Sequence, residues 1–249
     1  MDGFDNLRPP AVQPDDDVRF ICFTNVPTLP RVYPWEYRPV YVAGAPCRTS
    51  RVAKILPHLM LPDDTEFSIW HDGNFQLRKG AHLIVDELLG HHDWAAHQHP
   101  CRTCIYDEAD ILIREKIGTP ELVEAEVGRY KEQGYPSGAG LWANGLIVRR
   151  HTAETAELNE RWWRLYAAGC ERDQLSFPVA RRESGMEIRT ITEGGGIYDS
   201  PYTLFRWHAA WSHRDDNPDY WPQRNRLRER LRQLAAVTGS DGGIRHFDY

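Results

Sequence analysis

The residues of this sequence that suggest chemistry most directly are Asp72, Gly73 and Asn74, which follow the apolar stretch 67–71. Two oxygen-bearing side chains at positions i and i+2 across a glycine can point at one ion or one polar ligand. A hard cation such as Mg²⁺ or Mn²⁺ prefers oxygen ligands. Asp, Gly and Asn are also the usual turn-forming residues, so the triplet by itself favours an ordinary turn over a ligand site.

A second candidate feature is the basic stretch that begins at Arg51, about twenty residues before Asp72. Arg51 and Lys54 are one helical turn apart, so both can reach toward one diphosphate. Arg would bind a phosphate through its two-pronged guanidinium, and Lys would bind it as a point charge. The alternative is an ordinary solvated helix face.

Three further positions carry polar or aromatic groups that suit a sugar site. Asp173 follows a helix that ends near 169–170, and it could act as general base toward an attacking hydroxyl, with Gln174 hydrogen-bonding the sugar. Asp173 could equally be a helix N-cap. Trp142, in a glycine-flanked stretch, offers a face on which a sugar ring could stack, although such turns need no function.

Composition limits the class of protein. The chain has 249 residues, 41% of them hydrophobic, and a formal net charge of -6. This charge does not suit a nucleic-acid-binding protein, and no apolar run approaches the roughly 18 residues of a membrane span. The start has neither the basic nor the apolar region of a signal peptide, and the five cysteines do not suggest a disulfide framework. We therefore expect a cytoplasmic protein.

The order of elements predicts one α/β domain over residues 18–249, preceded by a flexible arm at 1–17 that is rich in Pro and Asp. Strands and helices alternate, which favours an open, mostly parallel central sheet flanked by helices, with ligands bound at the carboxyl ends of its strands. Expected strands are 18–26, 40–45, 67–77, 93–100, 139–151 and 186–191. Expected helices are 51–61 (capped by Ser50, with Leu59 packed inward), 80–90, 104–117, 119–134, 152–170, 172–185 and a basic surface helix at about 223–237.

Three stretches together resemble a known family. Residues 51–77, 96–110 and 140–177 are similar, in this order and spacing, to the glycosyltransferase-like domain of plant mucilage- and pectin-associated proteins (TOD/MUCI type) and of many bacterial proteins. The resemblance covers roughly residues 18–213. It implies a GT-A fold, a Rossmann-like sheet that binds a nucleoside diphosphate sugar, often with a divalent metal.

The resemblance also implies roles for individual residues. Asp72 would meet the ribose or the bridging metal, and Asn74 departs from the family pattern because an amide is a weaker metal ligand than a carboxylate. A histidine near the carboxyl end, His208 or His213, would complete the metal shell. The remaining donor-binding positions are Thr24 and Asn25 at the base and ribose, and His99 and Arg102 at the sugar.

We therefore predict a glycosyltransferase that moves a sugar from a nucleoside diphosphate sugar to the hydroxyl of a carbohydrate or other acceptor. The cofactor implied is Mn²⁺ or Mg²⁺, and the requirement for a metal is in question because Asn74 stands where many relatives have a second carboxylate. Two alternatives remain: a non-catalytic carbohydrate- or nucleotide-binding domain on the same scaffold, and a metal-dependent nucleotide-sugar hydrolase.

Overall fold

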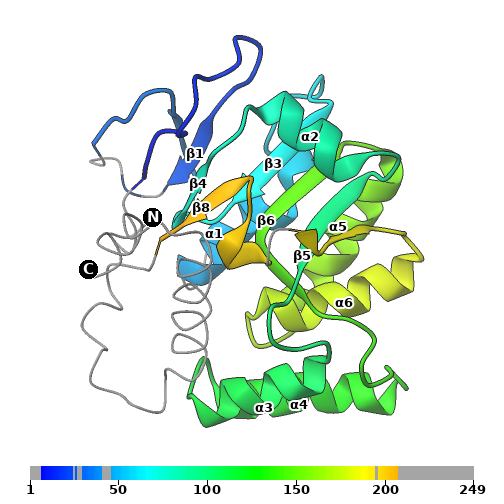
Figure 1. Ribbon diagram of the computed structural model, residues 1–249. Coiled ribbons are helices and arrows are strands. Elements are labelled where there is room, and N and C mark those ends of the chain that lie inside the picture. Colours follow the sequence, from blue (N-terminus) through cyan, green and yellow to red (C-terminus); the bar gives the residue numbers. More distant parts are fainter. Residues whose placement is uncertain (1–6, 25, 27–29, 41–45, 194–195, 207–249) are drawn as a thin grey trace, which may run out of the picture. The chain divides into compact units, whose positions relative to one another are not determined.

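The computed structural model describes residues 7–24, 26, 30–40, 46–193 and 196–206 (Figure 1). Most of the expected elements are present, with shifted ends. The strands are β1 (Ile21–Thr24), β2 (Glu36–Pro39), β3 (Phe67–His71), β4 (Phe75–Leu77), β5 (Trp94–Gln98), β6 (Trp142–Arg150), β7 (Arg189–Ile191) and β8 (Thr203–Phe205). The helices are α1 (Pro46–Ile55), α2 (Ala81–Leu89), α3 (Ile105–Arg114), α4 (Pro120–Glu132), α5 (Ala153–Ala167) and α6 (Asp173–Ser184), with short 3-10 turns η1 (Pro57–Leu59) and η3 (Ile197–Asp199).

The central sheet is mixed, so the expectation of a mostly parallel sheet is wrong. Its strand order is β3-β6-β5-β7. β6 pairs antiparallel with both neighbours, and only β5 and β7 pair in parallel. β3, β5 and β7 nevertheless run in one direction, so their carboxyl ends share one edge of the sheet. Two small sheets, parallel β1-β2 and antiparallel β4-β8, accompany the central one.

Helices cover both faces of the central sheet. On one face, α1, α5 and α6 enclose a core that includes Trp94, Trp162 and Phe177, in which Trp94 and Phe177 stack at 5.4 Å. On the other face, α2 packs its Ile84 and Leu88 against β6. A third cluster joins α3, α4 and α6, and Figure 1 shows α3 and α4 lying together below the sheet. Because β6 is central, its residues are buried on both faces.

A bulge interrupts β6 near its start. Ala96 of β5 pairs with Ile147, but the next residue, His97, pairs with Ala143, so residues 144–146 are extra on the β6 side. The bulge needs glycine at 145, because a Cβ there would lie 2.7 Å from the Phe75 ring and 2.9 Å from Ile197. Bulges re-aim side chains next to functional sites. This one directs the Asn144 side chain toward α6 and the Gly145 carbonyl toward β3.

Helix α1 differs from its expected form at both ends. It begins at Pro46, so Ser50 lies inside the helix and the prediction that Ser50 caps it is wrong. The helix ends at Ile55, before Pro57, as expected from the missing N–H of proline. Leu59 is 66% exposed, contrary to the expected inward packing, because η1 breaks the helical periodicity. The strand expected at 40–45 lies mostly outside the described residues. The strand that pairs with β1 is β2, which ends just before that stretch.

The connection between α5 and α6 is held by a buried carboxylate. Glu126 of α4 accepts hydrogen bonds from the Tyr130 hydroxyl (2.8 Å) and from the backbone N–H of Cys170 (2.7 Å). Gly169 leaves the space, since a Cβ there would lie 2.3 Å from the Glu126 carboxylate. Two residues later Glu171 adopts a left-handed φ of 63°, and Arg48 of α1 pairs with it at 3.1 Å. These contacts fix the start of α6.

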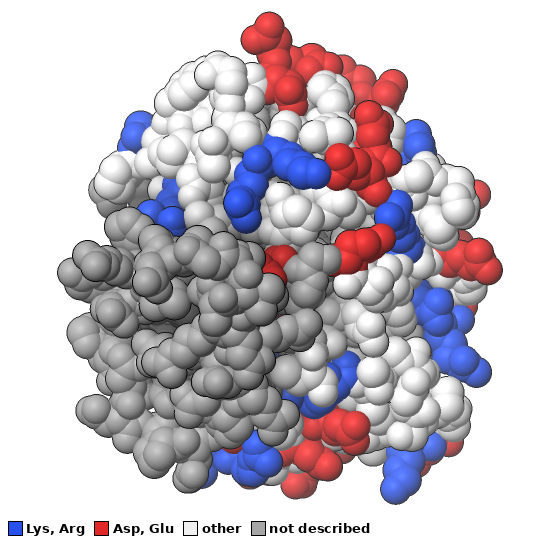
Figure 2. Space-filling model, viewed as in Figure 1, with Lys and Arg blue, Asp and Glu red and all other residues white. Residues whose placement is uncertain are grey.

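The described part of the expected amino-terminal arm contacts the domain. The Ala11 N–H bonds the Leu77 carbonyl (2.7 Å), and the Asp15 carboxylate accepts from the Ala81 N–H at the start of α2 (2.8 Å). The basic helix expected at 223–237 lies outside the described residues. Among the helices that the structure describes, none is long and apolar enough to cross a membrane. On the face in Figure 2, acidic and basic residues intermingle in the described part.

The Glu126 contacts generate a stability prediction. Glu126→Ala leaves the Tyr130 hydroxyl and the buried Cys170 N–H without an acceptor, and each such loss costs about 1–3 kcal/mol. We expect a loss of about 3 kcal/mol in the free energy of unfolding, measured by urea denaturation. Tyr130→Phe, which removes one donor and keeps the carboxylate, should cost about 1 kcal/mol. Equal losses in the two variants would contradict the role of the Glu126 carboxylate in holding the α5–α6 connection.

Candidate active site

The candidate site is built around a buried lysine. Lys54 on α1 is 1% exposed, and its ammonium lies 2.7 Å from Asp173 Oδ2 and 3.3 Å from Asp72 Oδ1. One carboxylate begins α6 and the other follows β3, so three elements meet at this ammonium. A buried charge requires paired and hydrogen-bonded surroundings. The sequence prediction that Lys54, Asp72 and Asp173 belong to one site is therefore consistent with their positions, although they are far apart in the chain.

Asp173 is the most enclosed acidic group of this cluster. Its carboxylate is 6% exposed, with Arg51 Nε 3.3 Å from Oδ1 and Lys54 on Oδ2. Burial favours the neutral acid, but the positive charges of Arg51 and Lys54 outweigh it and hold the pKa of Asp173 well below its usual range. Arg172 adds to this effect. Asp173 is the first residue of α6 and Arg172 is the cap position, so the side chain serves the ion pairs and the N-cap alternative is wrong.

Asp72 is the more open carboxylate, with 33% of its side chain exposed. It begins a turn closed by the Phe75 N–H on the Asp72 carbonyl (3.0 Å), so the turn reading of the triplet is confirmed. The Gly145 carbonyl in the β6 bulge accepts from the Asp72 N–H (2.9 Å), and the Trp70 indole donates to Asp72 Oδ1 (2.9 Å). The turn is therefore anchored on both sides while its carboxylate stays accessible.

Strand β6 also supports Asp173. Asn144 is 2% exposed, and its side-chain N–H donates to the Asp173 carbonyl at 3.4 Å. The Trp162 indole donates to the same carbonyl at 3.2 Å. Trp162 itself is fully buried. These bonds fix the backbone at the start of α6, and with it the direction of the Asp173 side chain.

Arg149 is a fully buried arginine behind the site. Its guanidinium donates to the Lys54 carbonyl (2.7 Å) and to the Asn159 side chain (3.1 Å), and lies 4.8 Å from the centre of the Trp94 ring. Burial lowers the pKa of Arg149 to about 9, so it stays protonated at neutral pH. Arg149 holds the carboxyl end of α1, where a cation also suits the helix dipole.

His99 and Arg102 form a second cluster with Glu108. The ring Nδ1 of His99 accepts from the backbone N–H of Cys101 (3.3 Å) and of Arg102 (3.1 Å), and its Nε2 lies 3.3 Å from the Arg102 guanidinium. The Arg102 guanidinium donates to Glu108 at 2.5 Å. Burial and the Arg102 charge lower the pKa of His99 to about 3, which keeps it neutral. Their bonds run within the β5–α3 loop and to Glu108, not to Asp72 or Asp173.

The other predicted residues are placed as follows. Thr24 ends β1, and its hydroxyl accepts from the Val26 N–H (3.0 Å), as in an ordinary turn. Trp142 is 6% exposed between Phe177 and Arg181, so it is a core residue and not an open stacking face. Gln174 is partly exposed beside Asp173. Asn25, His208 and His213 lie outside the described residues.

The described donors do not suit a divalent cation held by the protein alone. Asp72 supplies one carboxylate, which already accepts hydrogen bonds from Trp70 and Lys54, and Asn74 supplies a neutral amide. Within the described ranges, no group of three or more His, Cys, Asp or Glu side chains is placed to hold a metal ion. Hard cations require more oxygen ligands than this.

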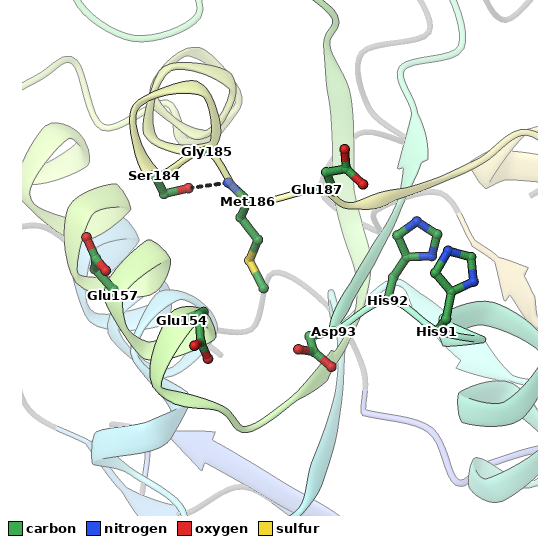
Figure 3. A pocket seen from close by; sticks show the side chains of 9 residues that line it. All are labelled: His91, His92, Asp93, Glu154, Glu157, Ser184, Gly185, Met186 and Glu187. Atoms are coloured by element: carbon green, nitrogen blue, oxygen red, sulfur yellow. Dashed lines mark hydrogen bonds between the residues drawn. The ribbon is translucent and has the colours of Figure 1, made fainter.

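A pocket of about 350 Å³ lies at the opposite end of β5 (Figure 3). Its acidic lining residues are Asp93, Glu154, Glu157 and Glu187, with His91 and His92 beside them. A diphosphate would be repelled by this set of carboxylates. None of the predicted site residues lines this pocket.

Three residues that support the site were not predicted from the sequence: Trp70, Arg149 and Asn144. Trp70 stands two positions before Asp72, and the period of two along a strand places both on one face. Arg149 is a charged residue inside an apolar strand, which is a signal of burial with a specific partner. Asn144 carries no comparable signal, because its bond to Asp173 depends on a bulge that strand alternation does not reveal.

The depressed pKa of Asp173 generates a prediction about pH. Asp173→Asn leaves Lys54 with one carboxylate, and removing one partner of a buried ion pair costs about 3–5 kcal/mol. Since the folded-state pKa is lowered, this stabilisation is complete above the pKa of an unfolded Asp, about 3.9, and is lost as pH falls further. The difference in unfolding free energy from wild type should be constant between about pH 7 and pH 5 and shrink below about pH 4.

Urea denaturation across this pH range measures the difference, with the exposed Asp64→Asn as the matched control. Asp64→Asn should show a small difference at every pH. A difference for Asp173→Asn that does not shrink in acid would show that its carboxylate is not the stabilising group.

Comparison with known proteins identifies the family of the chain. The crystal structure of mouse xyloside xylosyltransferase 1, apo form, is similar with a TM-score of 0.37 and 11% sequence identity, over 63% of this chain and 62% of that one. The chain thus spans less than two thirds of that protein's length. No curated protein sequence matched. The model of the TOD1/MUCI70 glycosyltransferase-like domain matches residues 40–190, which contain Arg51, Lys54, Asp72 and Asp173, so the chain belongs to this family.

Proposed function

We propose that this protein is a glycosyltransferase that uses a nucleoside diphosphate sugar and transfers the sugar to a hydroxyl of an acceptor. The observation that carries the proposal is the convergence of Arg51 and Lys54 with Asp72 and Asp173 at one edge of the sheet. Membership of a glycosyltransferase-like family supports the class of reaction. Cations that face a departing diphosphate stabilise the charge that develops as the glycosidic bond breaks.

The residues divide between the two ends of the donor. Arg51 and Lys54 face the diphosphate, and Asp72, the exposed carboxylate, meets the ribose. Thr24 lies toward the base, and His99 and Arg102 lie toward the sugar. His99 is neutral, so its ring brings no positive charge to the sugar side of the site.

Asp173 fits a positioning role better than that of a general base. A carboxylate whose pKa is held well below its usual range takes up a proton poorly. Both of its oxygens already contact cations. In this proposal Asp173 orients Arg51 and Lys54, and the neighbouring Gln174 hydrogen-bonds the sugar.

The proposal is tested first by binding. Nucleoside diphosphates and their sugars, screened one at a time, should raise the melting temperature. A ligand at 100 times its Kd stabilises by about 2.7 kcal/mol, and about 2–4 °C is expected per kcal/mol for a domain of this size. No shift with any base or sugar would contradict the proposal.

The second test is transfer of a radiolabelled sugar by Asp72→Ala. We expect a loss of about 100-fold or more in transfer, because a group that contacts the donor is removed. Asp64→Ala, an exposed carboxylate before β3, is the control and should keep wild-type transfer. Release of free sugar without acceptor, at the rate of transfer, would indicate a hydrolase instead. Donor binding without turnover would indicate a binding domain.

A further inference from the structure

We infer that the Lys54 ammonium takes the place of a protein-bound divalent cation, so that the diphosphate is bound without a metal. The inference deepens the proposed function and rests on it. Lys54 Nζ lies between the two carboxylates that a metal at this position would need, 2.7 Å from Asp173 and 3.3 Å from Asp72. An ammonium at these distances and a metal ion cannot occupy the same space.

The charge of the cluster supports the inference. Lys54, Arg51 and Arg172 act on Asp173 with positive charge. The two carboxylates, Asp72 and Asp173, do not outnumber these cations. A divalent cation would therefore enter a region that is already positive, whereas a diphosphate would be attracted to it.

The position of Lys54 is also firmly held. Its side chain is 2% exposed, its carbonyl accepts from buried Arg149, and α1 is tied to the α5–α6 connection by Arg48 and Glu171. Moving the ammonium aside for a metal would leave a buried charge without its partners, which is costly. The two contacts are unequal: Asp173 is enclosed and close, and Asp72 is exposed and more distant. Lys54 can thus turn from Asp72 toward a phosphate while it keeps Asp173.

The neutral amide of Asn74 fits this arrangement. A second carboxylate at 74 would add negative charge beside Asp72 and favour a metal. Asn74 is 7% exposed, and its carbonyl accepts from the Arg206 N–H (2.8 Å), so this residue helps to hold the turn. The neutral amide at 74 and the buried lysine therefore have one explanation.

The first experiment titrates Mn²⁺ into ligand-free protein and follows the free Mn²⁺ signal by electron paramagnetic resonance. Wild type should bind Mn²⁺ weakly. Lys54→Ala and Lys54→Met leave two carboxylates without the ammonium, so at least one of them should bind Mn²⁺ about tenfold more tightly, equivalent to about 1.4 kcal/mol. The control is Lys79→Ala, which removes a lysine outside the site. Lys79 pairs with Glu87 at 2.7 Å, and this variant should behave as wild type.

Tight, stoichiometric Mn²⁺ binding by wild type that is lost in Asp72→Asn would overturn the inference. So would unchanged, weak binding in both folded Lys54 variants. This titration needs no sugar donor, so its result does not depend on the proposed function.

The second experiment measures inorganic pyrophosphate binding by thermal shift in EDTA. Wild type and Lys79→Ala should be stabilised equally with EDTA and with Mn²⁺, and Lys54→Met should lose the shift in EDTA. A wild-type shift that appears only with Mn²⁺ would overturn the inference. No shift under either condition would count against the proposed diphosphate site, and the Mn²⁺ titration would still decide the role of Lys54.

Discussion

The structure of the site depends on one interaction, the buried ammonium of Lys54 between two carboxylates. An ammonium that is almost fully removed from water loses several kcal/mol of hydration free energy, and only close, well-placed anions offset this loss. Asp173 and Asp72 are those anions, and they lie on α6 and on the turn after β3. The relative positions of α1, β3 and α6 are therefore constrained by the need to keep this charge paired. An arrangement that moved α1, β3 or α6 away from the other two would leave a buried charge without its partner.

Strand β6 is the frame on which these elements are fixed. At its carboxyl end Arg149 holds the Lys54 carbonyl, and at its amino end the bulge supplies the Gly145 carbonyl to Asp72 and the Asn144 amide to Asp173. Because β6 runs in the reverse direction between β3 and β5, its amino end lies beside the carboxyl end of β3, where the Asp72 turn begins. The mixed sheet is thus not incidental to the site. It places supports for Lys54, Asp72 and Asp173 on one continuous strand.

These features differ in how far a sequence reveals them. Periodicity predicted most helices and strands, and turn chemistry predicted the bend at Asp72. The direction of β6 was mispredicted because a strand buried on both faces reads as the same apolar run in a parallel or an antiparallel neighbour pair. The pairing of Lys54 with Asp173 joins residues more than a hundred positions apart, and no local pattern encodes such a contact. Only the family resemblance placed both in one site, without indicating that they touch.

The unequal environments of the two carboxylates determine what each can contribute. Asp173 is enclosed, contacts two cations and has a low proton affinity, so it is suited to fixing charge and not to moving protons. Asp72 is one-third exposed and holds Lys54 at the longer distance, so it is the partner that a ligand can replace. Under the proposed function, the oxygens of a bound diphosphate would accept hydrogen bonds from the Lys54 ammonium in place of Asp72, and Asp72 would regain water. The Lys54 ammonium thus stays paired with Asp173 throughout, while its contact with the exposed Asp72 can be exchanged for one with an anion.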